Sequence, residues 1–344
     1  MGIGIQFTPG FRLIDGSDLN AMISQINAAL ASVGPLSGVT YFVNETIGND
    51  GSANSGLNPA YPLKTLDQAL VLESAALAAA GLSSVGRNSV VAFWGSQHRT
   101  STLAWNLPAT HLLGISNGIR RGQRARISVT GTTGFNQLVK VSAQGCLFQN
   151  FQTFYGWPNT SAALINWEDD AGHSCYNNVE FLGFGDGTAT TGSAALTGSR
   201  AFKFNSVTGE SSWYNCVFGV DTEQRTATNY TLEIAGGAPR LHFENCTFEA
   251  DIGSGGTAGS HVLIGASGID RYLKFKSCNF FSAVDSGGSA MAQGFNITAT
   301  PGGTIELDQC VCNGITAWQT TPITAFVMNM VLSTSGGGKA HEVF

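Results

Sequence analysis

Acidic residues that lie close together in the sequence are the candidates for chemistry in this 344-residue chain. Two neighbouring carboxylates can act as nucleophile and acid about 5–5.5 Å apart, or as base and acid about 6.5–9.5 Å apart. The densest groups are Glu168, Asp169, Asp170, Asp221 and Glu223. Because the segment 168–170 is typical of a solvated turn, these five residues stay candidates and none is assigned as catalytic.

Motifs for metals, cofactors and nucleophiles are missing from the sequence. The six histidines form no H-x-x-x-H or H-E-x-x-H pattern, and no G-x-S-x-G or phosphate-binding glycine loop is found. The seven cysteines are an odd number without a C-x-x-C pair, which argues against a disulfide framework and a zinc site. We therefore expect free thiols and no metal or cofactor.

The charge of the chain limits its partners. Its net charge is −6, which argues against nucleic acid and anionic membranes as partners, because both attract a basic surface. The one basic cluster, Arg120, Arg121, Arg124 and Arg126, is interpreted as a solvated loop. No apolar run reaches the roughly 18–20 residues of a membrane helix, and no secretory signal precedes residue 10. We expect the chain to fold in a cytoplasm.

A six-residue pattern repeats along the second half of the chain. The first and fourth residues are apolar, the third is typically Asn, and the sixth is small or aromatic, while the second and fifth vary. Its third positions are Asn150, Asn178, Asn215, Asn245, Ser277 and Gln309, at intervals of 28, 37, 30, 32 and 32 residues. A second alternating strand and glycine-rich turns lie between the copies, and only 12% of residues are charged. These features predict an all-β, right-handed, single-stranded parallel β-helix, since propeller blades need about 40–50 residues each.

The repeat predicts three stacked columns of side chains. The asparagines would form a ladder at a corner where the backbone is left-handed, a conformation that Asn tolerates. Cys216, Cys246, Cys278 and Cys310 would form a second column, which is either a line of metal thiolates or a buried small filler, and the filler is favoured. Phe181, Phe218, Phe248 and Phe280 would stack in the core.

The same repeat argues against a pair of carboxylates on one face. Glu244 and Asp308 share a position two repeats apart, and Lys276 holds that position between them. A lysine between two acids is expected to pair with them rather than leave an acid–acid pair.

Residues 38–70 resemble the beginning of the pectate-lyase-like β-helices of tailed-phage virion proteins. The resemblance is carried by Tyr41-Phe-Val43, by Gly48-Asn-Asp50-Gly51, and by the run from Pro59 through Pro62 and Thr65 to Ala69. It implies a β-helix over residues 38–332, a helical cap near 64–81 and a homotrimer on the particle. It says little about activity, because this fold carries lyases, hydrolases and inert fibres.

Residues 1–37 are expected to form a short helical segment for anchoring or oligomerisation. The apolar residues of this segment are Phe11, Leu13, Ile14, Leu19, Met22, Ile23, Ile26 and Leu30. From Leu19 onward they follow helical spacing. An alternative is that this helix simply folds onto the solenoid. Residues 333–344 are expected to be a flexible tail.

Three functions stay open at this point. The resemblance favours a non-enzymatic virion protein, a capsid decoration protein or a head or tail fibre that contacts other virion proteins. The alternative is a tailspike lyase or glycoside hydrolase that cleaves host surface polysaccharide. A third reading is a carbohydrate-binding module that depends on Trp157 or Trp167.

Overall fold

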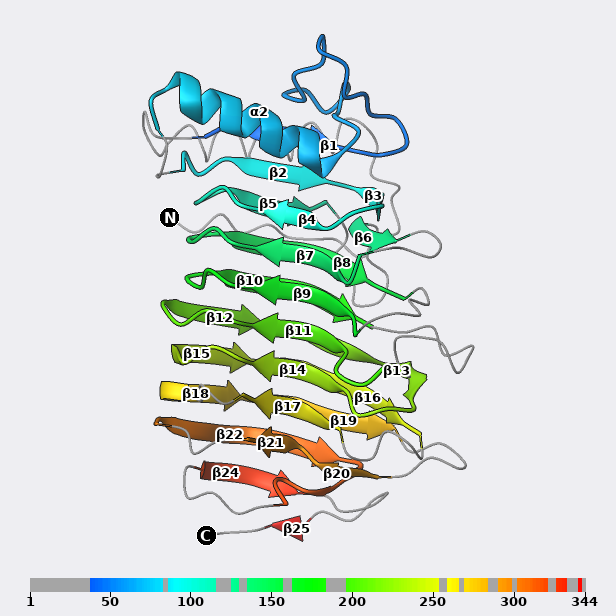
Figure 1. Cartoon of the computed structure of the whole chain (residues 1–344), viewed down its shortest axis with the longest axis vertical. Helices are drawn as coiled ribbons and strands as arrows, with labels where there is room; N and C mark the ends of the chain where they lie inside the picture. Colours follow the sequence, from blue (N-terminus) through cyan, green and yellow to red (C-terminus); the bar gives the residue numbers. More distant parts are fainter. Residues whose placement is uncertain are drawn as a thin grey trace, which may run out of the picture.

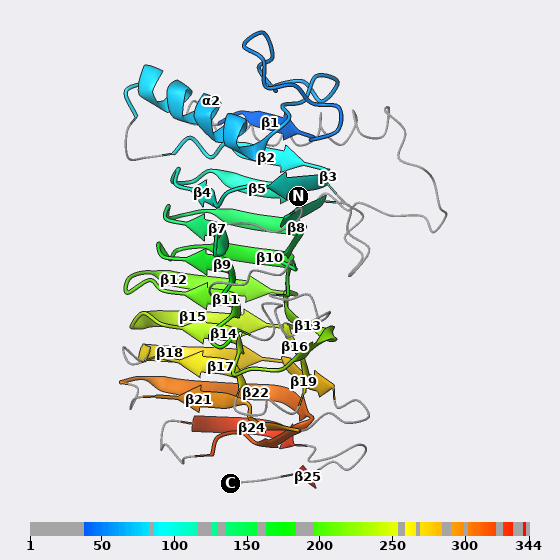
Figure 2. The ribbon, with the colours of Figure 1, turned by 45° about the vertical axis from the view of Figure 1, so that its right-hand side comes forward.

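The computed structural model describes residues 38–82, 86–115, 125–129, 135–156, 163–183, 196–253, 259–265, 269–283, 290–298, 302–320, 326–332 and 340–341. Within these ranges the chain is a parallel β-helix whose coils stack along the long axis of the molecule (Figures 1 and 2). The expected N-terminal helical segment, with its eight apolar residues, lies outside these ranges. So do residues 333–339 and 342–344 of the expected tail.

One face of the solenoid is a long parallel sheet that runs from one end of the molecule to the other. Each strand pairs with the strand of the next coil, so residues about 30 positions apart lie side by side. In stacking order its strands are β1 (Thr40–Val43), β2 (Val90–Phe93), β5 (His111–Gly114), β8 (Leu147–Phe154), β10 (Cys175–Leu182), β12 (Glu210–Tyr214), β15 (Ala238–Glu244), β18 (Ile269–Lys276), β22 (Thr304–Asn313) and β24 (Phe326–Leu332).

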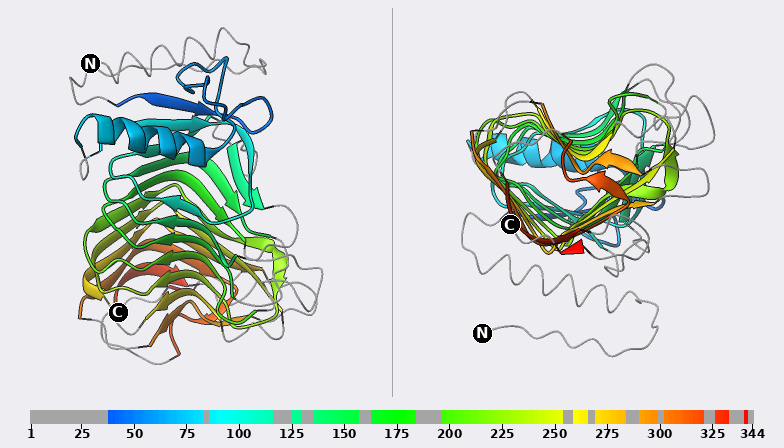
Figure 3. Two further views of the ribbon diagram at one scale, coloured as in Figure 1. Left: turned by 45° about the horizontal axis from the view of Figure 1, so that its top comes forward. Right: turned by 90° about the horizontal axis from the view of Figure 1, so that it is seen from below.

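A second parallel sheet contains the alternating strands between the repeats. Its strands are β4 (Leu103–Trp105), β7 (Gln137–Val141), β9 (Ile165–Asp169), β11 (Arg200–Phe204), β14 (Tyr230–Ile234), β17 (Ser260–Ile264) and β21 (Phe295–Ile297). Viewed along the axis, the coils superimpose on one another (Figure 3). Every strand pair in this sheet is parallel, as a solenoid requires.

The third face continues directly from the first, because β8, β10 and β22 are long strands that bend from one face to the other. The further strands of this face are β3 (Gly95–Arg99), β6 (Ala125–Val129), β13 (Val217–Arg225), β16 (Thr247–Ile252) and β19 (Asn279–Ala283). Two short pairs complete the described strands, β20 (Met291–Gln293) with β23 (Ile315–Ala317), and β25 (Ala340–His341) antiparallel to β24.

The bend between the first and third faces falls on the third residue of each repeat. All six residues have a left-handed backbone, with φ between 52° and 59°. In the ladder, Asn178 Nδ2 donates a hydrogen bond to Asn150 Oδ1 at 2.9 Å. Asn is among the few side chains that adopt this conformation readily, which explains its recurrence at the corner.

Aromatic rings fill the core as two stacks on either side of this corner. Phe181, Phe218, Phe248 and Phe280 are fully buried, with successive ring centroids 5.1, 4.8 and 4.7 Å apart. The second stack contains Phe148, Tyr176, Trp213, Phe243 and Phe275, and its closest rings are 4.2 Å apart. Identical spacing between coils places rings over rings, and such contacts add to the free energy of burial.

The cysteine column lies beside the corner and is almost completely buried. Cys246 Sγ donates to the carbonyl oxygen of Trp213 at 3.5 Å, and Cys278 Sγ does the same to Phe243 at 3.5 Å. Burial raises the pKa of the Cys246 and Cys278 thiols well above the usual value, so both stay protonated at neutral pH. Protonated thiols that bond backbone carbonyls between coils act as a small structural filler.

The motif in residues 48–65 positions a helix over the end of the solenoid. Helix α2 (Leu66–Ala79) lies across the first coils (Figure 1). Asp50 Oδ1 accepts hydrogen bonds from the backbone N–H groups of Lys64 and Thr65, and its Oδ2 accepts one from Thr65 Oγ1. Thr65 Oγ1 in turn accepts from the N–H of Gln68, as a helix N-cap does. The motif residues therefore fix the start of the capping helix.

We expect Thr65→Ala to lower the free energy of unfolding by about 1 kcal/mol, because it removes the N-cap and the bond to Asp50. Urea denaturation followed by circular dichroism measures the loss. Thr46→Ala is the matched control, since Thr46 is exposed and its hydroxyl makes no hydrogen bond among those described. Equal stability of the two variants would contradict the capping role.

Candidate functional site

The densest acidic segment ends strand β9, and the structure corrects the expectation that it is a solvated turn. Asp169 is completely buried and Glu168 is only 7% exposed. Asp169 Oδ1 accepts hydrogen bonds from the N–H groups of Ala171 at 3.0 Å and Gly172 at 2.9 Å. Its Oδ2 accepts from the Tyr176 hydroxyl at 2.8 Å. The carboxylate thus holds the turn after β9 against the core, where a buried polar group needs partners.

Tyr176 links this carboxylate to a tryptophan in the core. Trp167 Nε1 donates to the Tyr176 hydroxyl at 3.2 Å, and the Tyr176 hydroxyl donates to Asp169. Trp167 is fully buried, so it cannot stack on an external sugar ring, and the carbohydrate-binding reading loses that residue. Trp157, its other candidate, lies outside the described residues.

Burial raises the pKa of Asp169, although hydrogen bonds from Gly172 and Tyr176 oppose that rise. The native state therefore keeps the proton to a higher pH than the unfolded chain, where Asp titrates near 3.9. The stability from this group is fully present below the unfolded pKa and is lost as pH rises through the native pKa. We expect the denaturation midpoint of Asp169→Asn to fall less between pH 4 and 7 than that of the unmodified protein. Parallel pH curves for the two proteins would contradict this.

The two neighbours of Asp169 form ion pairs with lysines of adjacent strands in the second sheet. Glu168 lies 3.2 Å from Lys203 Nζ, and Asp170 lies 2.7 Å from Lys140 Nζ. Burial raises the pKa of Glu168 against the opposing effect of Lys203. For Asp170 burial acts upward, but the bonds from Lys140 and Asn205 outweigh it and lower the pKa. Each acid in the segment is therefore engaged by neighbouring strands.

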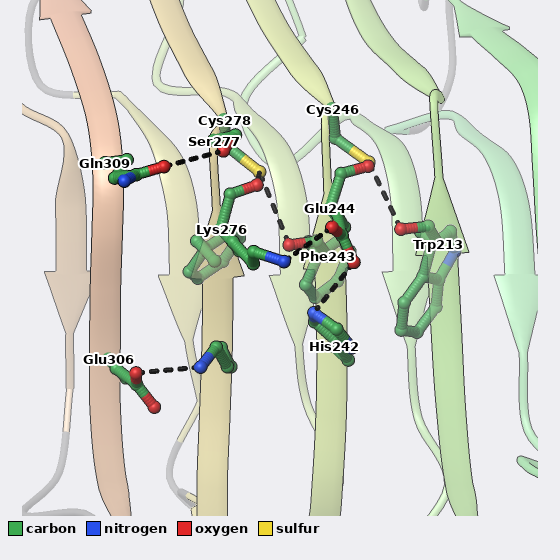
Figure 4. A network of polar contacts seen from close by, with 12 residues as sticks. Trp213, His242, Phe243, Glu244, Cys246, Lys276, Ser277, Cys278, Glu306 and Gln309 are labelled. Atoms are coloured by element: carbon green, nitrogen blue, oxygen red, sulfur yellow. Dashed lines mark hydrogen bonds and ion pairs between the residues drawn. The ribbon is translucent and has the colours of Figure 1, made fainter.

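On the first face, lysines and acids follow one another at equivalent positions of successive coils, so a lysine separates the acids. Lys276 Nζ lies 2.8 Å from Glu244 Oε1, and Lys274 Nζ lies 2.9 Å from Glu306 Oε1 (Figure 4). The lysine between the two acid positions therefore pairs with one of them. These bonds join adjacent coils, so they favour the observed strand register.

The other two candidate acids lie on a bulge in strand β13. Val220 pairs with Ala250 and Gln224 pairs with Asp251, so residues 221–223 are extra on this strand. Asp221 and Glu223 belong to this insertion. Bulges of this kind redirect side chains and are common beside functional sites. The structure does not bring these two acids to the 168–170 segment, which ends a strand of the second sheet.

A groove lies on the third face beside this bulge, with a volume of about 310 Å³. We define it by the residues that line it, which are Arg126 of β6, Gln152 and Phe154 of β8, Leu182 of β10, Val220 and Thr222 of β13, and Glu249 of β16. The volume is at the lower end of the roughly 300–1,000 Å³ of small-molecule sites. The groove combines three apolar side chains with four polar ones, Arg126, Gln152, Thr222 and Glu249.

Gln152 is the most informative residue of the groove. It is 1% exposed, and its Nε2 donates to Glu180 Oε2 at 2.7 Å. Its Oε1 has no hydrogen-bond partner within the part of the chain that the structure describes. Leaving a buried acceptor unpaired costs about 1–3 kcal/mol. The oxygen itself is enclosed by the fold, so a ligand in the groove does not reach it.

Sequence reasoning missed this groove. It places Arg126 in a solvated loop, whereas the structure places it in strand β6, in register with Gln152; Arg120, Arg121 and Arg124 lie outside the described residues. It ignores Gln152 and Glu180, which share the fifth position of their repeats and pair in register, and Glu249, which follows the sixth position of its repeat. The bulge that forms one wall has no repeat counterpart, so only the register of the coils could reveal the groove.

Within the described ranges, no group of three or more His, Cys, Asp or Glu side chains could hold a metal ion. Among the helices of the same ranges, none has the length and apolarity needed to span a bilayer.

Comparison with known proteins adds a likeness in fold. No family model and no curated protein sequence matches the chain. Two solved structures of pectin methylesterase are similar, a mutant in complex with hexasaccharide IV at a TM-score of 0.46 and a complex with hexasaccharide VII at 0.47. Each pectin methylesterase is 13% identical in sequence to this chain. The alignment covers 81% of this chain and 80% of the pectin methylesterase chain. The likeness lies in the parallel β-helix.

Proposed function

We propose that the protein is a non-enzymatic structural β-helix, displayed on the surface of a tailed-phage virion as a capsid decoration protein or a head or tail fibre. The observation that carries the proposal is the use of the acidic segment 168–170 for turn hydrogen bonds and ion pairs within the fold. The resemblance of residues 38–70 to phage β-helices supports the location. Ladders that run from coil to coil suit a rigid projecting rod.

Assembly into a homotrimer and docking through residues 1–37 belong to the same proposal. The apolar residues of that segment offer a surface for particle proteins or for other copies of the chain. The solenoid would then project outward, where it could meet host surface polysaccharide.

The proposal is tested on purified particles of the phage that encodes the chain. An antibody against the purified protein should label intact particles in electron micrographs, on the head or on the tail. Light scattering of the purified protein should give three times the chain mass of 36.0 kDa. Absence of label on particles that contain all other structural proteins would overturn the virion role.

The second candidate function is cleavage of a host surface polysaccharide by a lyase or glycoside hydrolase. The groove favours it, because it holds the buried carboxylate of Glu249 beside an arginine and a glutamine. Incubation with capsular and surface polysaccharides, followed by assays for reducing ends and unsaturated uronates, decides between the two. Cleavage that Glu249→Gln abolishes would replace the non-enzymatic proposal.

A further inference from the structure

We propose that the apolar stripe of residues 19–30 packs into a hollow at the capped end of the solenoid, within the same chain. The stripe consists of Leu19, Met22, Ile23, Ile26 and Leu30. The docking role that we propose for residues 1–37 then falls to Phe11, Leu13 and Ile14, which precede the stripe. The contact between stripe and hollow does not itself depend on the virion role.

Apolar side chains point outward from the loop between β1 and α2. This loop reaches past helix α2 at the capped end of the molecule (Figures 1 and 2). Ile47 and Tyr61 are 64% and 70% exposed, and both line a hollow of about 240 Å³ that we call the cap hollow. Its other lining residues are Asn49, Gly51, Ala53, Asn54, Ala60 and Pro62. Single exposed apolar residues are common, but two at one concave site indicate a contact surface.

The loop is held in one shape by its own asparagines. Asn44, Asn49, Asn54 and Asn58 each accept, through Oδ1, a hydrogen bond from the backbone N–H group two residues further along. Asn54 Nδ2 also donates to the carbonyl oxygens of Asn49 at 2.8 Å and Pro62 at 2.7 Å. These amides therefore stabilise the loop itself. A preformed surface loses little conformational entropy when a partner covers it.

The stripe and the cap hollow are both free of charge. No described residue that lines the cap hollow is charged. Residues 19–38 likewise contain no Asp, Glu, Lys, Arg or His. A charged ligand would find no counter-charge in this lining. The volume lies below the roughly 300–1,000 Å³ of small-molecule sites, so the side chains of a protein segment fit the cap hollow better.

The stripe needs an apolar surface in order to be stable as a helix. Isolated helices shorter than about 12–15 residues are marginal in water, and residues 19–30 are at this limit. Their apolar side chains fall on one face at helical spacing. Packing of this face against Ile47 and Tyr61 removes apolar area from water on both sides of the contact.

The link between stripe and hollow favours a contact within one chain. The loop belongs to the first coil, because the N–H of Phe42 in β1 donates to the carbonyl oxygen of Gly56 at 2.8 Å. Residues 31–38 can extend about 26–29 Å. The path along β1 from Gly38 to Asn44 is about 20 Å, so the stripe can reach the cap hollow. A short tether gives it an effective concentration on the order of millimolar, which a separate chain in dilute solution lacks.

Photo-crosslinking of the full chain tests the contact and identifies its occupant. Tyr61→p-benzoylphenylalanine places a probe in the cap hollow that captures neighbouring C–H groups on irradiation. We expect it to capture residues 19–30, in a product that keeps the chain mass of 36.0 kDa on a denaturing gel. The same probe at Val207 is the matched control, since Val207 is 68% exposed in the turn between β11 and β12. It should not capture that segment.

Hydrogen exchange measured by mass spectrometry gives a second readout. Tyr61→Ser and Ile47→Asn should each speed the exchange of the amides of residues 19–30 about tenfold, because the stripe loses apolar contact. Val207→Ser should leave that exchange unchanged. A product at twice the chain mass, capture of another segment, no capture, or exchange that neither variant changes would each overturn the inference. Particle labelling is measured separately, so failure here leaves the virion proposal standing.

Discussion

We expect Asp169→Ala to lower the free energy of unfolding by about 3 kcal/mol or more. The substitution leaves three donors in the core without their acceptor, the N–H groups of Ala171 and Gly172 and the Tyr176 hydroxyl. Each unpaired buried donor costs about 1–3 kcal/mol, and relief from burying the carboxylate offsets part of the sum. Urea denaturation followed by tryptophan fluorescence measures the change.

Asp170→Ala is the matched control for this prediction. Asp170 is the next acid in the chain, and its carboxylate pairs with Lys140 at the surface. Exposed ion pairs contribute about 0–1 kcal/mol, so we expect at most that loss. If Asp169→Ala kept full stability and instead abolished a polysaccharide cleavage, Asp169 would be catalytic and the structural assignment would be wrong.

The second large effect is expected in the aromatic stack, where Phe280→Ala should cost about 3–5 kcal/mol. Phe280 is fully buried and stacks on Phe248 at 4.7 Å. Its edges meet Phe275, Phe295 and Trp318 between 5.5 and 5.6 Å. Removing the ring leaves a cavity that stiff neighbouring coils cannot close, so the cost includes both lost burial and empty volume.

Phe281 supplies the control on the same strand. It follows Phe280 but points to the opposite side of β19 and is only half-buried. We expect Phe281→Ala to cost less than half as much in the same denaturation experiment. Phe280→Leu, which conserves most of the volume, should cost less than about 1.5 kcal/mol if it packs well. Similar losses at 280 and 281 would show that the stack is not the main source of stability.

The repeat made much of the solenoid predictable. A solenoid places equivalent residues of successive coils in contact, so the demands of the fold appear in the sequence at regular positions. The recurring Asn predicts a left-handed backbone at the corner, and the recurring aromatic residues predict a stack of rings in the core. The buried cysteines follow the same logic, because they hold the fourth position of the repeat, which is buried and apolar in every copy and is Phe151 and Val179 in the first two.

The acidic segment could not be interpreted from its sequence alone. Glu168, Asp169 and Asp170 are adjacent polar residues before a glycine, which is typical of an exposed turn. Whether such a turn faces solvent or core depends on where the next coil begins, and here Tyr176 of the following strand reaches back to Asp169. A hydrogen bond between two coils has no signature in local composition.

By itself the sequence determined the parallel β-helix, its corner ladder and the position of the capping helix, since all three arise from periodic or local patterns. Only the tertiary structure decided which acids are buried and that a groove exists. Arg126, Gln152 and Glu249 come together through strand register and through a bulge that occurs on one strand alone. The physical reason is that burial and proximity depend on the packing of distant coils, which a local pattern does not encode.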